Sequence, residues 1–426
     1  MKKIVLIALP ALALIASCSK TEVTPAQTDP QQISFFTLVN RQGTKADAII
    51  SGTAYPTDET FGTFAYYNDK DVVFPGDASA TPSSTYAELY IPKEEVKYSS
   101  PTTGNYAWTT QKAYYWPKQG SLTFFSFSPY DELKDDAVSS CDAATGITIT
   151  DWDVDKNQTV DVMVADVAKN QQKKDEVTTS DPYKGVATVF RHKLSQIVSF
   201  SFKTDEDYLN GHDGTTKAYV AGDKKFYIND VKINNLDYKG TYVSGNDVNG
   251  STTTYDTTTP SKATKNGWNT TNANNDVKSY HWYQKDGKVE TGNDANIFGT
   301  TAVEAKANKL ADSRSYLLAL PQRFANPGTS AAKDVKNIQI SYTISTYNGK
   351  DWVDEEVKDV YASLWAVQGG KAADVTAGTQ EVAAGAWEIN KKISYTITIS
   401  LKNDRIYWAP SVAEWDTTFF DDYVID

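Results

Sequence analysis

The strongest constraint on the fold is a two-residue alternation of apolar and polar side chains near the C-terminus. In residues 393–401, ISYTITISL, every second residue is apolar, and residues 338–345, IQISYTIS, repeat the alternation. Successive side chains of a strand point to opposite faces of a sheet, so this pattern fits a strand with one buried face. We therefore expect half-buried strands in antiparallel sheets.

Shorter apolar runs recur along the chain between clusters of Gly, Asn, Asp, Pro and Thr. Many short strands separated by turn residues are typical of antiparallel β-sandwiches. Residues 303–311, VEAKANKLA, are the one modest helix candidate. The other expected strands are residues 61–67, 122–127, 186–190, 197–202, 226–233 and 316–320.

The length of 426 residues predicts more than one domain, because single cores rarely grow to that size. The chain is 40% hydrophobic and 12% aromatic, which is ample material for packed cores. We expect an all-β chain of two β-sandwich domains, residues 46–184 and 185–426. The polar residues 168–185 would form the junction, and the Thr- and Asn-rich residues 245–276 an exposed loop of the second domain.

The first seventeen residues have the pattern of a signal peptide. Two lysines precede an apolar run of residues 4–15, which would rise only about 18 Å as a helix, too short to cross a bilayer. Ile15-Ala16-Ser17-Cys18 resembles a bacterial lipobox, which implies cleavage before Cys18 and lipidation of its thiol. Residues 18–32 would then form a polar tether to the outer membrane.

Charge and motif content argue against several classes of function. The net charge of −12, without a cluster of Lys and Arg, argues against nucleic acid as a partner. Asp151, Asp153 and Asp155 match the first three ligands of a calcium loop, but Lys156 and Val162 stand where Gly and Glu are needed. We expect a solvated turn there, and no metal or cofactor.

No catalytic residues are predicted. The three histidines lie far apart, His192 is expected to be structural, and no nucleophile elbow or phosphate-binding Gly loop is present. Cys141 is expected to be a buried small side chain. A hydrolase with two close carboxylates stays an alternative, and exposed aromatic rings at residues 114–117 (YYWP) or 281–284 (HWYQ) could bind sugars.

Several segments together resemble the fimbrillin family of Bacteroidetes, the subunits of type V pili. The resemblance implies two transthyretin-like β-sandwich domains, export as a lipoprotein and activation by a trypsin-like protease. The segments that carry it are FGTFAYYN (61–68), KAYYWPKQGSLTFFSFSPY (112–130), VFRHKLSQIVSFSF (189–202), YLLALPQRF (316–324) and Glu414-Trp415.

In such pilins the protease cuts after a basic residue just beyond the first strand, so residues 33–45 are read as a removable strand with its cleavage region. Lys45-Ala46 fits the family position, whereas Arg41 is the stricter match to an Arg-specific protease. Both sites stay open.

The removable strand would lie at the margin of a sheet, where its loss leaves unpaired backbone groups beside an apolar groove. One face carries Ile33, Phe35, Thr37 and Val39, and the other carries Phe36 and Leu38. A neighbouring subunit could refill the groove by donor-strand complementation.

The donor candidate is the C-terminal stretch of residues 417–426, with apolar residues on both faces; the alternative is that it forms the last strand of its own domain. Phe419, Tyr423 and Ile425 share one face, and Phe420 and Val424 the other.

The sequence thus predicts a structural subunit of an adhesive type V pilus at the cell surface. Its partners would be other pilin subunits, a trypsin-like protease and, before processing, the outer membrane. We favour a shaft subunit or another processed pilin over an anchor, and the loop of residues 245–276 leaves a tip adhesin open. The competing prediction is a monomeric surface lipoprotein that binds glycan or a host protein.

Overall fold

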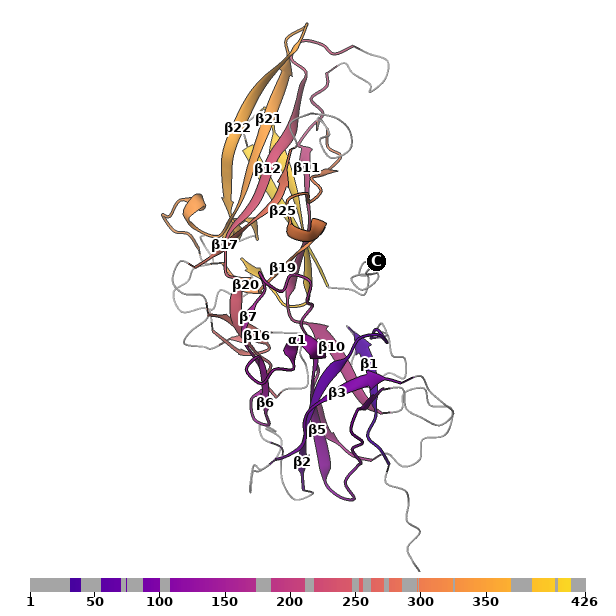
Figure 1. Ribbon diagram of the computed structural model, residues 1–426. Coiled ribbons are helices and arrows are strands. Elements are labelled where there is room, and N and C mark those ends of the chain that lie inside the picture. The colour runs from indigo at the N-terminus through magenta and orange to yellow at the C-terminus, as the bar shows by residue number, and fades with distance from the viewer. Residues whose placement is uncertain are drawn as a thin grey trace, which may run out of the picture.

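The computed structural model describes residues 31–39, 55–69, 74, 87–99, 108–173, 185–210, 218–246, 253–255, 262–271, 276–285, 297, 299–324, 326–368, 385–402 and 405–414. These residues form an elongated stack of β-sheets, with the first strands at one end and the long strands β12, β21 and β22 at the other (Figure 1). The expected all-β fold class is confirmed.

The first sheet closes on itself. Its strands follow the order β2-β3-β4-β1-β10-β8-β5-β9, and an additional pairing of β2 with β5 joins the path into a ring. Apolar residues from its strands form one core cluster inside the ring. The strands are β1 (Phe35–Val39), β2 (Phe61–Asn68), β3 (Glu88–Tyr98), β4 (Trp108–Thr110), β5 (Ser121–Ser128), β8 (Met163–Ala165), β9 (Ala168–Gln171) and β10 (Val186–His192).

A second sheet packs against the outside of the ring. Phe64 of β2 and Phe125 of β5 point away from the ring interior and join a core cluster with residues of this sheet. Its order is β16-β13-β7-β6. The strands are β6 (Ser139–Asp142), β7 (Gly146–Asp153), β13 (Lys239–Val243) and β16 (Gly267–Thr270).

Two further sheets pack face to face around the third core cluster, at the end where the long strands lie (Figure 1). One has the order β18-β11-β24-β25, with β19 also paired to β11, and the other has the order β17-β12-β21-β22. The strands are β11 (Ser195–Thr204), β12 (Lys224–Leu236), β17 (Lys278–Gln284), β18 (Val303–Glu304), β19 (Leu317–Ala319), β21 (Asn337–Tyr347), β22 (Trp352–Ser363), β24 (Lys391–Ser400) and β25 (Arg405–Glu414).

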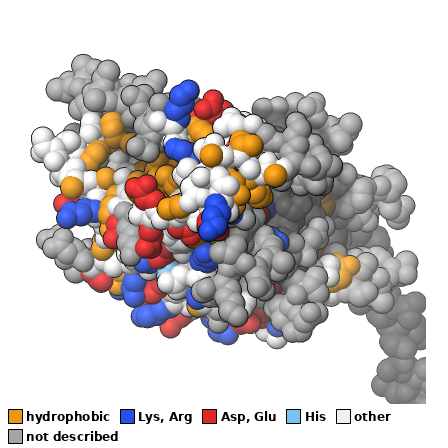
Figure 2. All heavy atoms as spheres, turned by 90° about the horizontal axis from the view of Figure 1, so that it is seen from above, with side chains coloured by type: hydrophobic (Ala, Val, Ile, Leu, Met, Phe, Trp, Pro, Cys, Tyr) orange, Lys and Arg blue, Asp and Glu red, His pale blue; other side chains and the backbone are white. Residues whose placement is uncertain are grey.

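Small elements complete the described part of the chain. The strand pairs are β14 (Thr254–Tyr255) with β15 (Ala263–Lys265), and β20 (Gln322–Arg323) with β23 (Ala386–Trp387); the helical turns are α1 (Tyr130–Leu133), η1 (Ala311–Ser313), η2 (Ala332–Asp334) and α2 (Leu364–Val367). Seen from the end opposite the ring, hydrophobic, acidic and basic side chains are interspersed on the visible described surface (Figure 2).

Alternation located the strands well. In β24, Ile393, Tyr395, Ile397 and Ile399 are buried, while the hydroxyl residues between them are half-buried, apart from the last. The strands expected at residues 61–67, 122–127, 186–190, 197–202 and 226–233 correspond to β2, β5, β10, β11 and β12. Residues 316–320 contain the short strand β19.

The helix expected at residues 303–311 is wrong. Val303–Glu304 form strand β18, and the next residues are not helical until η1 begins at Ala311. The backbone groups of Ala305 are already used: its N–H donates to the carbonyl of Phe200 at 2.8 Å, and its carbonyl accepts from the indole of Trp282 at 2.9 Å. Tertiary partners therefore override the local helix propensity.

The sheets do not separate at the boundary expected between residues 184 and 185. Strand β10, which follows that boundary, pairs with β1 and β8 of the ring. Strand β13, much later in the chain, pairs with β7. The chain therefore returns to the first half after residue 185.

The first strand is not at the margin of its sheet. Strand β1 lies between β4 and β10 in the ring, so the expectation of an edge strand is corrected. The pairing of β1 is much more extensive on one side than on the other, since five residue pairs join it to β10 and one residue pair joins it to β4.

A pair of substitutions tests this packing. Ile397→Ala should lower the free energy of unfolding by about 2–5 kcal/mol, because it leaves a cavity in a closed core. The matched control Val412→Ala, on β25 with 50% of its surface exposed, should change it by about 0.5 kcal/mol or less. Denaturant unfolding would measure both, and equal losses would contradict the core assignment.

Candidate functional site

The candidate site is the seam of the ring that β1 fills. Strand β1 runs parallel to β10, in register from Phe35 opposite Val186 to Val39 opposite Phe190. The N–H of Val186 donates to the carbonyl of Ser34 at 2.8 Å. On the other side Phe35 is opposite Trp108. The seam is thus closed mainly by the ladder to β10.

Residues before β1 are also paired. The N–H of Ile33 donates to the carbonyl of Tyr114 at 2.8 Å, and the N–H of Trp116 donates to the carbonyl of Gln31 at 3.0 Å. These bonds lie on the β4 side, next to the bridge between Gln32 and Tyr115. The segment is therefore hydrogen-bonded from Gln31 onwards.

The side chains of residues 33–39 alternate between two faces as the sequence indicates. Ile33, Phe35 and Val39 are almost fully buried, with 0%, 1% and 0% of their surface exposed, and belong to the core inside the ring. Leu38 is also buried and Phe36 is half-buried. Most of the apolar surface of this strand is hidden from water.

Phe35 is the central contact of the seam. Its ring meets the rings of Phe61 and Phe124 edge to face, with centroids 5.7 Å apart in both pairs. Such aromatic pairs add about 0.5–1.5 kcal/mol each beyond the area they bury. Any segment that replaces β1 must present a side chain that can fill this place.

Gly185 allows β1 to approach β10 closely. A Cβ atom built on Gly185 would lie 2.7 Å from the carbonyl oxygen of Ser34 and 2.8 Å from its carbon, and the residue has a φ of +114°. Glycine is therefore required here because a side chain would collide with the backbone of Ser34 and because the positive φ disfavours other residues.

Several residues expected at functional positions lie outside the described part of the chain. They are the lipidation residue Cys18, the processing residues Arg41, Lys45 and Ala46, and the donor residues Phe419, Phe420, Tyr423, Val424 and Ile425.

The three aspartates that resemble a calcium loop each contact a lysine instead. Asp151 pairs with Lys239 at 3.5 Å, Asp153 with Lys156 at 3.2 Å and Asp155 with Lys278 at 3.1 Å. Asp151 and Asp153 belong to strand β7, not to a turn. Among the residues that the structure describes, no group of three potential metal ligands comes together.

His192 is fully buried, and its Nδ1 lies 2.6 Å from Oδ2 of Asp161, which is also buried. This pair sits at the end of β10. Cys141 is a free, half-buried thiol beside the second core cluster.

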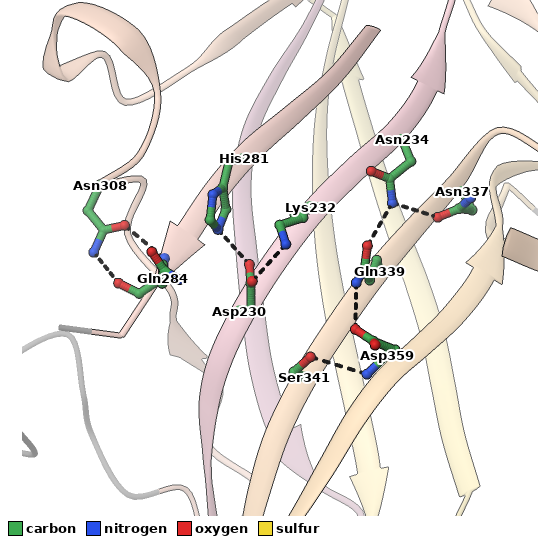
Figure 3. A network of polar contacts seen from close by, with 10 residues as sticks. All are labelled: Asp230, Lys232, Asn234, His281, Gln284, Asn308, Asn337, Gln339, Ser341 and Asp359. Atoms are coloured by element: carbon green, nitrogen blue, oxygen red, sulfur yellow. Dashed lines mark hydrogen bonds and ion pairs between the residues drawn. The ribbon is translucent and has the colours of Figure 1, made fainter. Parts of the chain in front are cut away.

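The two aromatic motifs offer little exposed ring surface. Trp282 and Tyr283 are core residues, with 0% and 1% of their surface exposed, and Tyr115 at 41% is the exposed ring of the YYWP segment. Around the HWYQ segment the outer face of the sheet is polar: His281 lies 2.6 Å from Asp230, and Gln284 is hydrogen-bonded to Asn308 (Figure 3).

Sequence reasoning missed a buried polar cluster at the end of β10. Lys193 has only 1% of its surface exposed, and its Nζ donates to Oδ1 of Asn266 at 3.0 Å. The hydroxyl of Tyr242 donates to the same oxygen at 2.7 Å. The available signal was a lysine in the two-residue link between the strand-like segments VFRH and SQIV.

No described helix is long and apolar enough to cross a membrane.

The described fold is that of an all-β protein built from stacked sheets, with its first strand inserted in a ring. A family model described as fimbrillin-like matches residues 73–415. The chain therefore belongs to the fimbrillin-like family, and the family predicted from the sequence segments is confirmed. Membership places it among fimbrial proteins of the cell surface.

Solved structures give low-identity matches over most of the chain. A fimbrial protein from Bacteroides vulgatus is 16% identical, with a TM-score of 0.45 and coverage of 90% of this chain and 99% of that chain. The tip fimbrial protein Mfa3 from Porphyromonas gingivalis, with a C-terminal truncation, is 10% identical, with a TM-score of 0.31 and coverage of 84% and 94%. The fimbrial anchor protein Mfa2 from the same organism is 9% identical, with a TM-score of 0.30 and coverage of 91% and 99%. No curated protein matches the sequence.

Gly185 provides a test of the seam. Gly185→Ala should destabilise the protein and increase amide hydrogen exchange in residues 35–39, because the new Cβ would collide with the backbone of Ser34. The matched control is Gly222→Ala, which has a similar φ of +98° but open space around the Cβ. It should cost only the backbone strain of about 1–3 kcal/mol. Equal exchange in residues 35–39 of both variants would contradict the close approach.

Proposed function

We propose that this protein is a structural subunit of an adhesive fimbria that polymerises when its first strand is removed and replaced by a segment of another subunit. Family membership supports the fimbrial role, and the position of β1 supports the exchange. Strand β1 fills a seam that no other described strand of the ring occupies.

The single observation that carries the proposal is the burial of Ile33, Phe35 and Val39 in the ring core. Burial of a large apolar side chain is worth about 1.5–3 kcal/mol, so these three contribute roughly 5–9 kcal/mol. Whole domains are stable by only about 5–15 kcal/mol. A subunit that loses β1 therefore gains strongly from any segment that restores these contacts.

The interior position of β1 sets what a replacement strand would have to restore. Removing an edge strand exposes one row of backbone groups, whereas removing β1 exposes β10 and opens the ring beside β4. The ladder of five residue pairs to β10 must be remade by the incoming strand.

Proteolysis after Arg41 or Lys45 would release the strand. Either cut falls between Val39, the last residue of β1, and Tyr55, where the description of the chain resumes. After the cut, β1 is held only by non-covalent contacts. The apolar segment of another subunit can then compete for the same seam.

The C-terminal residues 417–426 are the proposed donor, and their pattern suggests a direction. From the C-terminus backwards, alternate residues of the proposed donor are Ile425, Tyr423, Asp421 and Phe419. The buried face of residues 33–39 carries Ile33, Phe35, Thr37 and Val39. A donor that runs opposite to β1 would put the ring of Tyr423 in the place of Phe35. In the same direction as β1, the carboxylate of Asp421 would take that place, at a large desolvation cost.

Before processing, the subunit would be a lipoprotein attached to the outer membrane through Cys18, with residues 18–32 as tether. The acyl chains would be left behind on the released segment once the chain is cut. A subunit with a usable cleavage site can join a shaft, and we assign this one to a processed position.

Limited digestion tests the processing step. Trypsin added to the native precursor should yield a product that begins at Gln42 or Ala46, because basic residues within hydrogen-bonded strands resist cleavage. Mass spectrometry and N-terminal sequencing would identify it. The double variant Arg41→Gln, Lys45→Gln should lose the product, and the control Lys20→Gln should keep it.

A digest in which no discrete product starts at either residue, or in which the double variant is cut as before, would contradict the proposed processing.

Substitutions in the terminal segment test the exchange. Tyr423→Ala or Ile425→Ala should reduce the yield of polymer after trypsin treatment about tenfold or more, because each removes an apolar contact worth more than about 1.4 kcal/mol. The control Asp422→Ala lies on the other face and should polymerise normally. Size-exclusion chromatography would measure the yield, and unchanged polymer in both variants would argue against this donor.

A further inference from the structure

The buried contact between Lys193 and Asn266 is the most unusual polar contact outside the seam. Lys193 lies in the two-residue link between β10 and β11, and Asn266 lies between β15 and β16. The two residues have only 1% and 3% of their surface exposed. An amine and an amide are thus held together away from water.

Both partners are fixed through their backbones. The N–H of Lys193 donates to the carbonyl of Val162 at 2.8 Å, and its carbonyl accepts from the indole of Trp268 at 2.5 Å. The N–H of Asn266 donates to the carbonyl of Ser244 at 3.1 Å, and its carbonyl accepts from the hydroxyl of Thr253 at 2.8 Å. The backbones that carry the two side chains are therefore held in place, which favours a defined approach of Nζ to the amide.

The surroundings favour a neutral amine. Burial lowers the pKa of Lys193 to about 7, with the charge of Asp166 opposing this shift and that of Arg191 adding to it. Asp166 and Arg191 form their own two-bond pair, with both distances 2.8 Å. An ordinary lysine amine is protonated and unreactive near neutral pH, whereas a desolvated one is a nucleophile.

The amide of Asn266 is polarised where it would react. Its Oδ1 accepts from Lys193 Nζ and from the Tyr242 hydroxyl, at 3.0 and 2.7 Å. Burial holds the pKa of Tyr242 well above its usual range, so the hydroxyl keeps its proton and stays a donor. A donor aimed at an amide oxygen stabilises the negative charge that develops there when a nucleophile attacks the carbon.

We propose that Lys193 and Asn266 form an intramolecular isopeptide bond. Nζ of Lys193 attacks Cγ of Asn266, so that a bond between Nζ and Cγ forms and the bond between Cγ and Nδ2 breaks. One proton passes from Nζ to Nδ2, which leaves as ammonia. The reaction needs no oxidant, reductant or added cofactor.

The bond would tie the end of β10 to the start of β16, across 73 residues of sequence. It would thus link the ring to the sheet that packs against it. This inference stands independently of the fimbrial role, because it concerns contacts within one chain.

Peptide mass spectrometry tests the proposal. The purified full-length protein, incubated at pH 9 and then denatured and digested with trypsin, should yield a linked pair of peptides that contains Lys193 and Asn266. Its mass should be the sum of the two peptides less one ammonia molecule. The digest should show no cleavage after Lys193.

Variants distinguish the two reacting residues, Lys193 and Asn266, from Tyr242, which polarises the amide. Lys193→Met and Asn266→Ala should abolish the linked pair, and Tyr242→Phe should slow its appearance at least tenfold while both reacting residues remain. The time course of the folded wild-type protein decides the proposal even where a variant does not fold. Two separate, unmodified peptides from the incubated wild-type protein would overturn it.

Discussion

The parallel ladder between β1 and β10 is the interaction on which the first half of the fold depends. Without β1, the ring would be open between β4 and β10, and the aromatic core inside it would reach solvent. Backbone groups in such a gap must find partners, and apolar side chains must be covered. Backbone hydrogen bonding and apolar burial thus both require a strand between β4 and β10.

That demand also explains why a short segment can have a large effect. Residues 33–39 are a short segment, yet the burial of Ile33, Phe35 and Val39 is worth roughly as much as the marginal stability of a domain. The covalent connection to the rest of the chain is not what holds it in place. In the proposed exchange, a strand from another molecule would substitute for it by presenting side chains that fit the seam.

The sequence allowed most strands to be located, because alternation reports directly which face of a strand is buried. Strands β21 and β24 follow from it, as does the buried face of Ile33, Phe35 and Val39. It could not reveal that β1 lies inside a ring, since the neighbours β4 and β10 are distant in sequence. The helix expected at residues 303–311 failed for the same reason, because the partners of Ala305 come from other strands. The cluster around Lys193 was missed because burial of a single lysine depends on Tyr242 and Asn266, which no local pattern connects to it.

The two-residue link between β10 and β11 has a mechanical consequence. Strand β10 belongs to the ring, and β11 belongs to the sandwich at the other end. Because only two residues join them, a force applied to β10 is transmitted directly to β11. A strand paired with β10 would bear this force parallel to its own axis. The backbone hydrogen bonds between the two strands would then have to break together rather than one after another. In the proposed polymer, this topology would carry tensile force from one molecule to the next.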